Sequence, residues 1–196
     1  MNNQEDQEYD YEYIEPALRT PEEVASRTII LVALSLVADG ADRDLCIKWI
    51  ESEGILEHVS PLEFKFFRNT SPSPNDVKEM QWRTKATLVL AWALQLIEDL
   101  PPSSQLYTQD KLWQKVPTLG NPTTEFIRNA SLRPHEEIWN LYHKITKEHW
   151  KANDAEFNKR EAPDGLIHGV AYERHYGINW LVNHCEQEWD NVDTDT

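Results

Sequence analysis

Residues 165–196 read GLIHGVAYERHYGINWLVNHCEQEWDNVDTDT, and they determine the fold that we predict for the chain. Apolar residues recur at steps of three and four through the first part of this stretch, which predicts an amphipathic helix over residues 165–184. The apolar stripe consists of Ile167, Val170, Ala171, Ile178, Leu181, Val182 and Cys185. Arg174 lies on the same stripe, so we expect a buried guanidinium that carboxylates from the rest of the fold neutralise.

A neighbouring face of the same helix carries Gly169, Glu173 and Gly177, each four residues from the next. Because glycine has no Cβ, two glycines on one helix face allow the backbone of another element to approach closely. We therefore expect this face to pack tightly against a second helix, with Glu173 between the two contacts.

The whole chain has 196 residues, of which 40% are hydrophobic, enough for one domain with a sizeable core. We predict an all-α fold: a single-domain irregular helical bundle built around two apolar central helices. The central helices are expected at residues 21–38, after the capping Thr20, and at residues 75–98. Shorter helices are expected over residues 42–52, 60–67 and 123–130. A further helix begins at Pro134, and its stripe comprises Ile138, Leu141, Tyr142, Ile145 and His149, followed by a charged connection over residues 150–164.

The formal net charge of −15 is concentrated at the two ends of the chain. Residues 1–17 form an acidic, tyrosine-rich arm, and residues 18–196 form the helical domain. In an extended arm, Tyr9, Tyr11 and Tyr13 share one side and could bind a partner. An acidic surface repels phosphate, which argues against nucleic acid; it allows a basic protein partner but does not demand one.

Two cysteines are too few for a disulfide framework, and we expect Cys46 and Cys185 to be reduced core thiols of a cytoplasmic protein. The acidic N-terminus does not resemble a secretory signal. The longest apolar runs, residues 28–38 and 86–97, are about half the ~20 residues that a membrane span requires, so we expect no membrane association.

Motifs for common chemistries are missing from the sequence. It contains no HExxH, no Glu-x-x-His pair, no Gly-rich phosphate loop and no GxSxG, so we expect no metal, no cofactor and no catalytic residue. Two hypotheses remain for Glu173, Arg174 and His175. In the first, buried Arg174 holds the last helix in register; in the second, Glu173 or His175 is a general base and Arg174 clamps an anion. We favour the first, because no nucleophile or cofactor motif accompanies the cluster.

The acidic end of the chain is expected to leave the helix near Cys185 or Glu186, because carboxylates oppose the dipole of a helix C-terminus. Trp189 and Val192 would then dock on the domain, and aspartates such as Asp190 could reach its basic residues. We assign structural roles to Arg174, Trp180, Trp189 and Asp190.

Six segments together resemble one protein family. They are TPEEVASR (residues 20–27), LAWAL (90–94), LRPHEEI (132–138), YERH (172–175), INWL (178–181) and WDNVDTDT (189–196). Over residues 18–196 the chain is similar to the bacterial family called domain of unknown function 4272. The resemblance implies a bacterial, largely helical, soluble protein, and it transfers no catalytic residue. Members often have Gly where this chain has Gln95, which implies a locally different helix contact.

For function we expect a non-catalytic protein-binding module, such as a bacterial immunity protein that binds and neutralises a basic toxin. Its candidate binding residues are Glu173, Arg174 and His175 together with the three tyrosines of the arm. The alternative is an enzyme of unfamiliar type with a Glu/Arg/His pocket.

Overall fold

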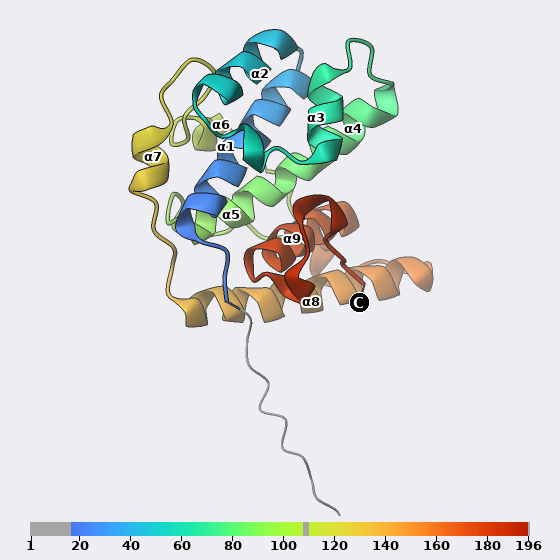
Figure 1. Ribbon diagram of the computed structural model, residues 1–196. Helices are drawn as coiled ribbons and strands as arrows, with labels where there is room; N and C mark the ends of the chain where they lie inside the picture. The colour runs from blue at the N-terminus through green and yellow to red at the C-terminus, as the bar shows by residue number, and fades with distance from the viewer. Residues whose placement is uncertain (1–16, 108–109, 196) are drawn as a thin grey trace, which may run out of the picture.

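The computed structural model describes residues 17–107 and 110–195, and all regular structure in these ranges is helical (Figure 1). The prediction of a single all-α domain is therefore confirmed. The α-helices are α1 Pro21–Ala38, α2 Arg43–Ser52, α3 Pro61–Arg68, α4 Pro74–Arg83, α5 Thr87–Ala93, α6 Asp110–Trp113, α7 Thr124–Arg128, α8 His135–Phe157 and α9 His168–Leu181. Short 3₁₀ turns are η1 Leu56–His58, η2 Thr84–Ala86, η3 Pro163–Gly165, η4 His184–Glu186 and η5 Trp189–Asn191.

Helix α1 begins at a complete capping box and then runs through the interior. The Thr20 hydroxyl accepts the Glu23 N–H, and the Glu23 carboxylate accepts the Thr20 N–H. Every residue from 24 to 35 is buried, because α2, α3, α4, α5 and α7 all pack around this helix. The apolar run of the sequence thus becomes a core helix.

The prediction of a single helix over residues 75–98 is wrong. Two helices, α4 and α5, form in its place, and the second ends at Ala93. Helix α4 passes through the turn η2 into α5, and Gln95 then takes a left-handed φ of 61°. Arg133 stabilises this early end: its Nε donates to the Trp92 carbonyl at 2.8 Å and its Nη2 to the Ile97 carbonyl at 3.0 Å. Glycine adopts a left-handed φ without strain, which explains why Gly suits the position of Gln95.

The charged connection predicted after Trp150 is also wrong, because α8 continues to Phe157. Ala152 and Ala155 are buried and extend the stripe that includes Ile145 and His149. These two small buried residues therefore continue the apolar stripe of α8 through a segment that is otherwise charged. In Figure 1, α8 is the long helix beneath the rest of the domain, and α9 lies against it.

Helix α9 is shorter than predicted at both ends. It begins at His168 and ends at Leu181, after which Asn183 and Cys185 have φ values of 52° and 53°. This reversal takes Cys185 away from the apolar stripe. Cys46 is buried as predicted, but the prediction that Cys185 is a core thiol is wrong, because it is exposed.

The C-terminal segment folds back onto the domain. Trp189 and Val192 are buried, and the Trp189 ring meets Trp180 and Tyr176 edge to face, at centroid distances of 5.4 and 5.1 Å. Asp190 accepts the Leu62 N–H at 2.9 Å, so it caps the first turn of α3. In this contact the aspartate reaches a backbone group, where the sequence suggested a basic side chain.

Candidate functional site

Helix α9 sends Glu173, Arg174 and His175 in three directions, because successive helical residues are rotated by about 100°. Glu173 faces α4, Arg174 faces Ser103 and α8, and His175 faces α8 in a different place. The three side chains predicted as one cluster therefore do not meet in one pocket.

Arg174 is a buried structural cation, with only 2% of its surface exposed. Its Nη1 donates to the Ser103 hydroxyl at 2.9 Å, and that hydroxyl donates to the Glu148 carboxylate at 2.5 Å. Burial lowers the pKa of Arg174 to about 10, with Glu148 opposing the shift, so the guanidinium stays charged at neutral pH. The Glu148 carboxylate is thus linked to Arg174 through the Ser103 hydroxyl, while Nε and Nη2 of Arg174 form no hydrogen bond with the described residues.

His175 belongs to a buried pair of imidazoles. Its Nδ1 lies 2.9 Å from the Nδ1 of His149, and its Nε2 lies 3.3 Å from the Thr146 hydroxyl. Burial lowers the pKa of both histidines to about 4, and each ring also disfavours a charge on neighbouring imidazoles. Both are neutral at pH 7, and with such low pKa values they are weak general bases.

The glycine face of α9 packs against the junction of α4 and α5. A Cβ placed on Gly177 would lie 3.0 Å from the Ala86 Cβ and 3.3 Å from the Ala86 backbone. A Cβ on Gly169 would lie 2.8 Å from the Trp82 ring. Gly177 therefore allows the Ala86 backbone to approach closely, and Gly169 allows the Trp82 ring to do so.

Glu173 lies between these contacts, with 6% of its surface exposed. Burial raises its pKa to about 7, although the Arg83 guanidinium opposes this shift from 3.5 Å away. Burial therefore destabilises the ionised carboxylate more than the ion pair with Arg83 stabilises it. Arg83 also lies over the Tyr176 ring, with its guanidinium carbon 3.4 Å from the centroid.

Glu173 lines a hollow of about 570 Å³, which we call the Glu173 hollow. Its lining includes Leu62, Met80, Trp82, Arg83, Tyr172 and Glu173. Aromatic and aliphatic side chains thus surround one buried carboxylate and its arginine. A titratable group with a shifted pKa beside a hollow is a common feature of functional sites.

Two further hollows adjoin the Glu173 hollow. The Trp180 hollow, of about 580 Å³, shares Leu62 with it, and its lining includes Arg19, Arg27, Trp180, Glu188 and Trp189. The His149 hollow, of about 690 Å³, shares His168 and Tyr172 with it, and its lining includes His149, Asn153, Thr194 and Asp195. Residues of α9 line all three hollows, and we call the three together the α9 groove.

The structural residues of the C-terminal segment also lie at this groove. Trp180 and Trp189 line the Trp180 hollow, and Arg27 lies over the Trp189 ring, 4.6 Å from its centroid. Arg27 itself pairs with the buried Glu63 carboxylate at 2.6 Å and donates to the His58 carbonyl. This ion pair joins α1 to α3 and holds Arg27 over the buried Trp180 and Trp189 rings.

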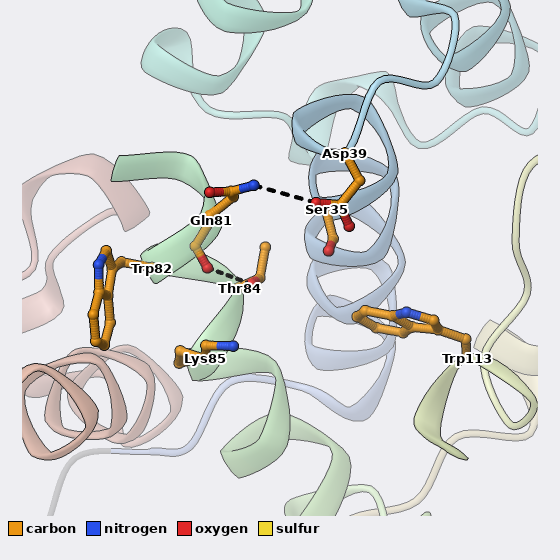
Figure 2. A pocket seen from close by; sticks show the side chains of 7 residues that line it. All are labelled: Ser35, Asp39, Gln81, Trp82, Thr84, Lys85 and Trp113. Atoms are coloured by element: carbon orange, nitrogen blue, oxygen red, sulfur yellow. Dashed lines mark hydrogen bonds between the residues drawn. The ribbon is translucent and has the colours of Figure 1, made fainter. Parts of the chain in front are cut away.

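Another hollow, of about 340 Å³, lies on the opposite side of Trp82, between α1, α4 and α6 (Figure 2). Gln81 donates from its side-chain amide to Asp39 at 3.2 Å, and the Thr84 hydroxyl donates to the Gln81 carbonyl at 2.6 Å. Figure 2 shows Trp82 directed away from Asp39 and Trp113, toward α9. The indole therefore separates this polar hollow from the Glu173 hollow.

The sequence identified Glu173 but not its surroundings. Leu62, Trp82 and Arg83 lie far from Glu173 in the sequence, and no motif marks them. The only signal was the spacing of Gly169 and Gly177, which predicted a close neighbour without naming it. Tyr9, Tyr11 and Tyr13 lie outside the residues that the structure describes.

Within residues 17–107 and 110–195, no group of three or more His, Cys, Asp or Glu side chains is arranged to hold a metal ion. None of the helices in the same ranges has both the length and the apolar character needed to cross a bilayer.

Comparison with known proteins gives one match. A family model described as domain of unknown function (DUF4272) matches residues 11–192, which covers nearly the whole chain. The match begins before the boundary predicted at residue 18, so it includes Tyr11 and Tyr13. No curated protein and no solved structure matches the chain.

Proposed function

The chain belongs to the DUF4272 family, and from this premise we propose that it is a binding protein that acts on a basic protein partner without catalysis. The observation that supports the proposal is the α9 groove. The Glu173 hollow shares lining residues with each of the other two, and all three have volumes typical of ligand sites, about 300–1,000 Å³. A row of adjoining hollows suits a polypeptide segment that places successive side chains into them.

The charge of the groove favours a basic partner. Acidic side chains surround it, namely Glu23, Glu57, Glu79, Glu188, Asp190 and Asp195. Its arginines and lysines are fewer, namely Arg19, Arg27, Lys78 and Arg83; Arg27 is already paired with Glu63 inside the domain, and Arg83 with Glu173. The net charge of −15 adds a long-range attraction for cationic proteins, which speeds their encounter with the groove.

The aromatic lining supplies the apolar part of such an interface. Trp82 and Tyr172 are partly exposed at the groove, and exposed Leu62 lines two of its hollows, whereas Trp180 and Trp189 lie buried beneath it. Tryptophan, tyrosine and arginine carry much of the binding energy in many protein interfaces. We include in the proposal a bacterial immunity role, in which the groove caps a basic toxin in the cytoplasm. The two free cysteines fit a reducing compartment.

The experiment uses the intact chain and the product of a toxin gene adjacent to its own gene. Calorimetry should detect a stoichiometric complex that weakens as salt rises. The double variant Glu57→Lys/Glu188→Lys reverses two exposed charges at the groove and should weaken binding about tenfold or more. Glu125→Lys, on α7 away from the groove, is the matched control and should leave affinity unchanged. Equal losses of affinity in the double variant and in the control would contradict the proposal. A complex whose affinity changes neither with salt nor in the double variant would also contradict it.

A second candidate is an enzyme centred on Glu173. The observation that favours it is the carboxyl pKa of about 7 beside a hollow, which suits a general base near neutral pH. Arg174 and His175 would then support the helix and take no part in the chemistry. If Glu173→Gln retains partner affinity but removes a turnover that the wild type performs, the enzyme hypothesis is preferred.

A further inference from the structure

The Glu173–Arg83 pair has buried polar atoms that form no hydrogen bond with the described residues. These are Oε2 of Glu173 and Nη1 of Arg83, which lie 3.5 Å apart. Buried polar atoms are nearly always hydrogen-bonded, since each one left without a partner costs stability. An acceptor and a donor therefore lie side by side at one wall of the Glu173 hollow.

The rest of the hollow restricts the shape of a molecule that could meet this pair. Trp82 and Tyr172 supply flat aromatic surfaces, and Leu62 and Met80 supply aliphatic ones. Gly169 is required for this shape, because a side chain there would occupy the position of the Trp82 ring. The walls favour a planar ring that can stack on or lie against the aromatic side chains.

The charges around the hollow restrict the ligand further. Arg83 and Lys78 disfavour a cation near Glu173, while Glu173 and Glu79 disfavour an anion near Arg83. A neutral molecule avoids both repulsions. It can still satisfy both buried atoms if it presents an N–H donor next to a carbonyl acceptor.

We propose that the Glu173 hollow binds an uncharged planar heterocycle through a lactam edge, whose N–H donates to Glu173 and whose carbonyl accepts from Arg83. Nucleobases and related ring amides have this edge. The site does not depend on the protein partner proposed above, because every contact comes from this chain. Its test accordingly uses the chain alone.

The experiment measures binding of uridine and inosine to the intact chain by calorimetry and thermal shift at pH 8. At this pH the Glu173 carboxyl, whose pKa burial raises to about 7, is ionised and can accept. The matched ligands are 3-methyluridine and 1-methylinosine, in which a methyl group replaces the donor hydrogen. We expect at least one parent nucleoside to bind, and its methylated form to bind about tenfold more weakly or not at all.

Protein variants locate the interaction. Glu173→Gln and Trp82→Leu should each weaken binding about tenfold, whereas Glu125→Gln, on α7 away from the hollow, should change it less than twofold. Circular dichroism checks the fold of each variant; if one variant unfolds, the other still decides the outcome. Absence of binding by both nucleosides at millimolar concentration overturns the proposal. Equal binding of parent and methylated ligands, or an equal loss in Glu125→Gln, also overturns it.

Discussion

The two sides of α9 differ in what their buried polar groups face. Toward α8, His175 meets His149, and Arg174 reaches Glu148 through Ser103, so both side chains face groups of this chain, although Nε and Nη2 of Arg174 form no hydrogen bond with the described residues. Toward α4, Glu173 lies beside a hollow with a carboxylate oxygen that accepts no hydrogen bond from the described residues. Three consecutive residues thus divide into a structural part and a part that can serve a ligand, although they look like one motif in the sequence.

The largest expected effect comes from the structural side. Arg174→Ala should lower the free energy of unfolding by about 3–5 kcal/mol, because it removes a buried cation and leaves Ser103 and Glu148 without their partner. Urea denaturation measures the change. Arg160→Ala is the control: that arginine pairs with Asp154 at the surface, and its loss should cost less than about 1 kcal/mol. A mild effect of Arg174→Ala would show that the cation does not hold α9 in place.

The two glycines sharpen the comparison within the side that faces α4. Gly177→Ala should destabilise the protein by about 1–3 kcal/mol, because the new methyl group meets the Ala86 backbone, which cannot move independently. In Gly169→Ala the neighbour is the partly exposed Trp82 ring, which can rotate, so stability should change by less than about 1 kcal/mol. Urea denaturation and tryptophan fluorescence distinguish the two. Similar losses in both variants would contradict this difference.

The pH dependence of stability should have opposite signs on the two sides of α9. The folded pKa of Glu173 is about 7 against an ordinary 4.5, so the folded state gains stability as pH falls from 7 to 4.5. The folded pKa values of His149 and His175 are about 4 against 6.5, so the folded state loses stability as pH falls from 6.5 to 4. In the wild type these trends partly cancel.

Glu173→Gln removes one of the two trends and should reveal the other. Between pH 7 and 4.5 the variant should lose up to about 3 kcal/mol more than the wild type, following about 1.4 kcal/mol for each pKa unit. Denaturation midpoints measured across pH 4–8 give the comparison. Parallel curves for the two proteins would mean that Glu173 titrates as an exposed carboxyl.

The smallest expected effect concerns the end of α5. Gln95→Gly should relieve the left-handed φ of 61° and stabilise the protein by about 0.5–1 kcal/mol, despite losing side-chain hydrogen bonds to Ser131 and Leu132. Gln95→Ala loses the same bonds but keeps the Cβ, so it should be less stable than the wild type. Thermal denaturation of the two variants tests this order.

Local patterns predicted the elements that obey them. Thr20 and Glu23 indicated where α1 begins, and the apolar stripe indicated most of α9. The end of α5 could not be predicted, because Gln95 is a residue that usually continues a helix and Arg133, which bonds the freed carbonyls, lies far along the chain. The exposure of Cys185 could not be predicted for a similar reason. The chain reverses at Asn183, which has a positive φ, and no glycine or proline marks this end of α9 in the sequence.

The sequence predicted only the residues that α9 contributes to the candidate site. The spacing of Gly169, Glu173 and Gly177 indicated a tightly packed face, but Trp82 and Arg83 occupy it through tertiary folding alone. Sequence proximity also grouped His175 and Arg174 with Glu173, whereas helical rotation separates them. A motif on a helix therefore predicts adjacency along the chain and not a shared environment.

The most direct test of the division within α9 compares two neighbouring variants, Glu173→Gln and Arg174→Met, by urea denaturation at pH 8. We predict that Glu173→Gln is at least as stable as the wild type, because it removes a desolvated charge whose pKa burial raises to about 7. Arg174→Met should be less stable by more than about 2 kcal/mol, because the Ser103–Glu148 pair loses its cation. Equal destabilisation by the two substitutions would contradict the account.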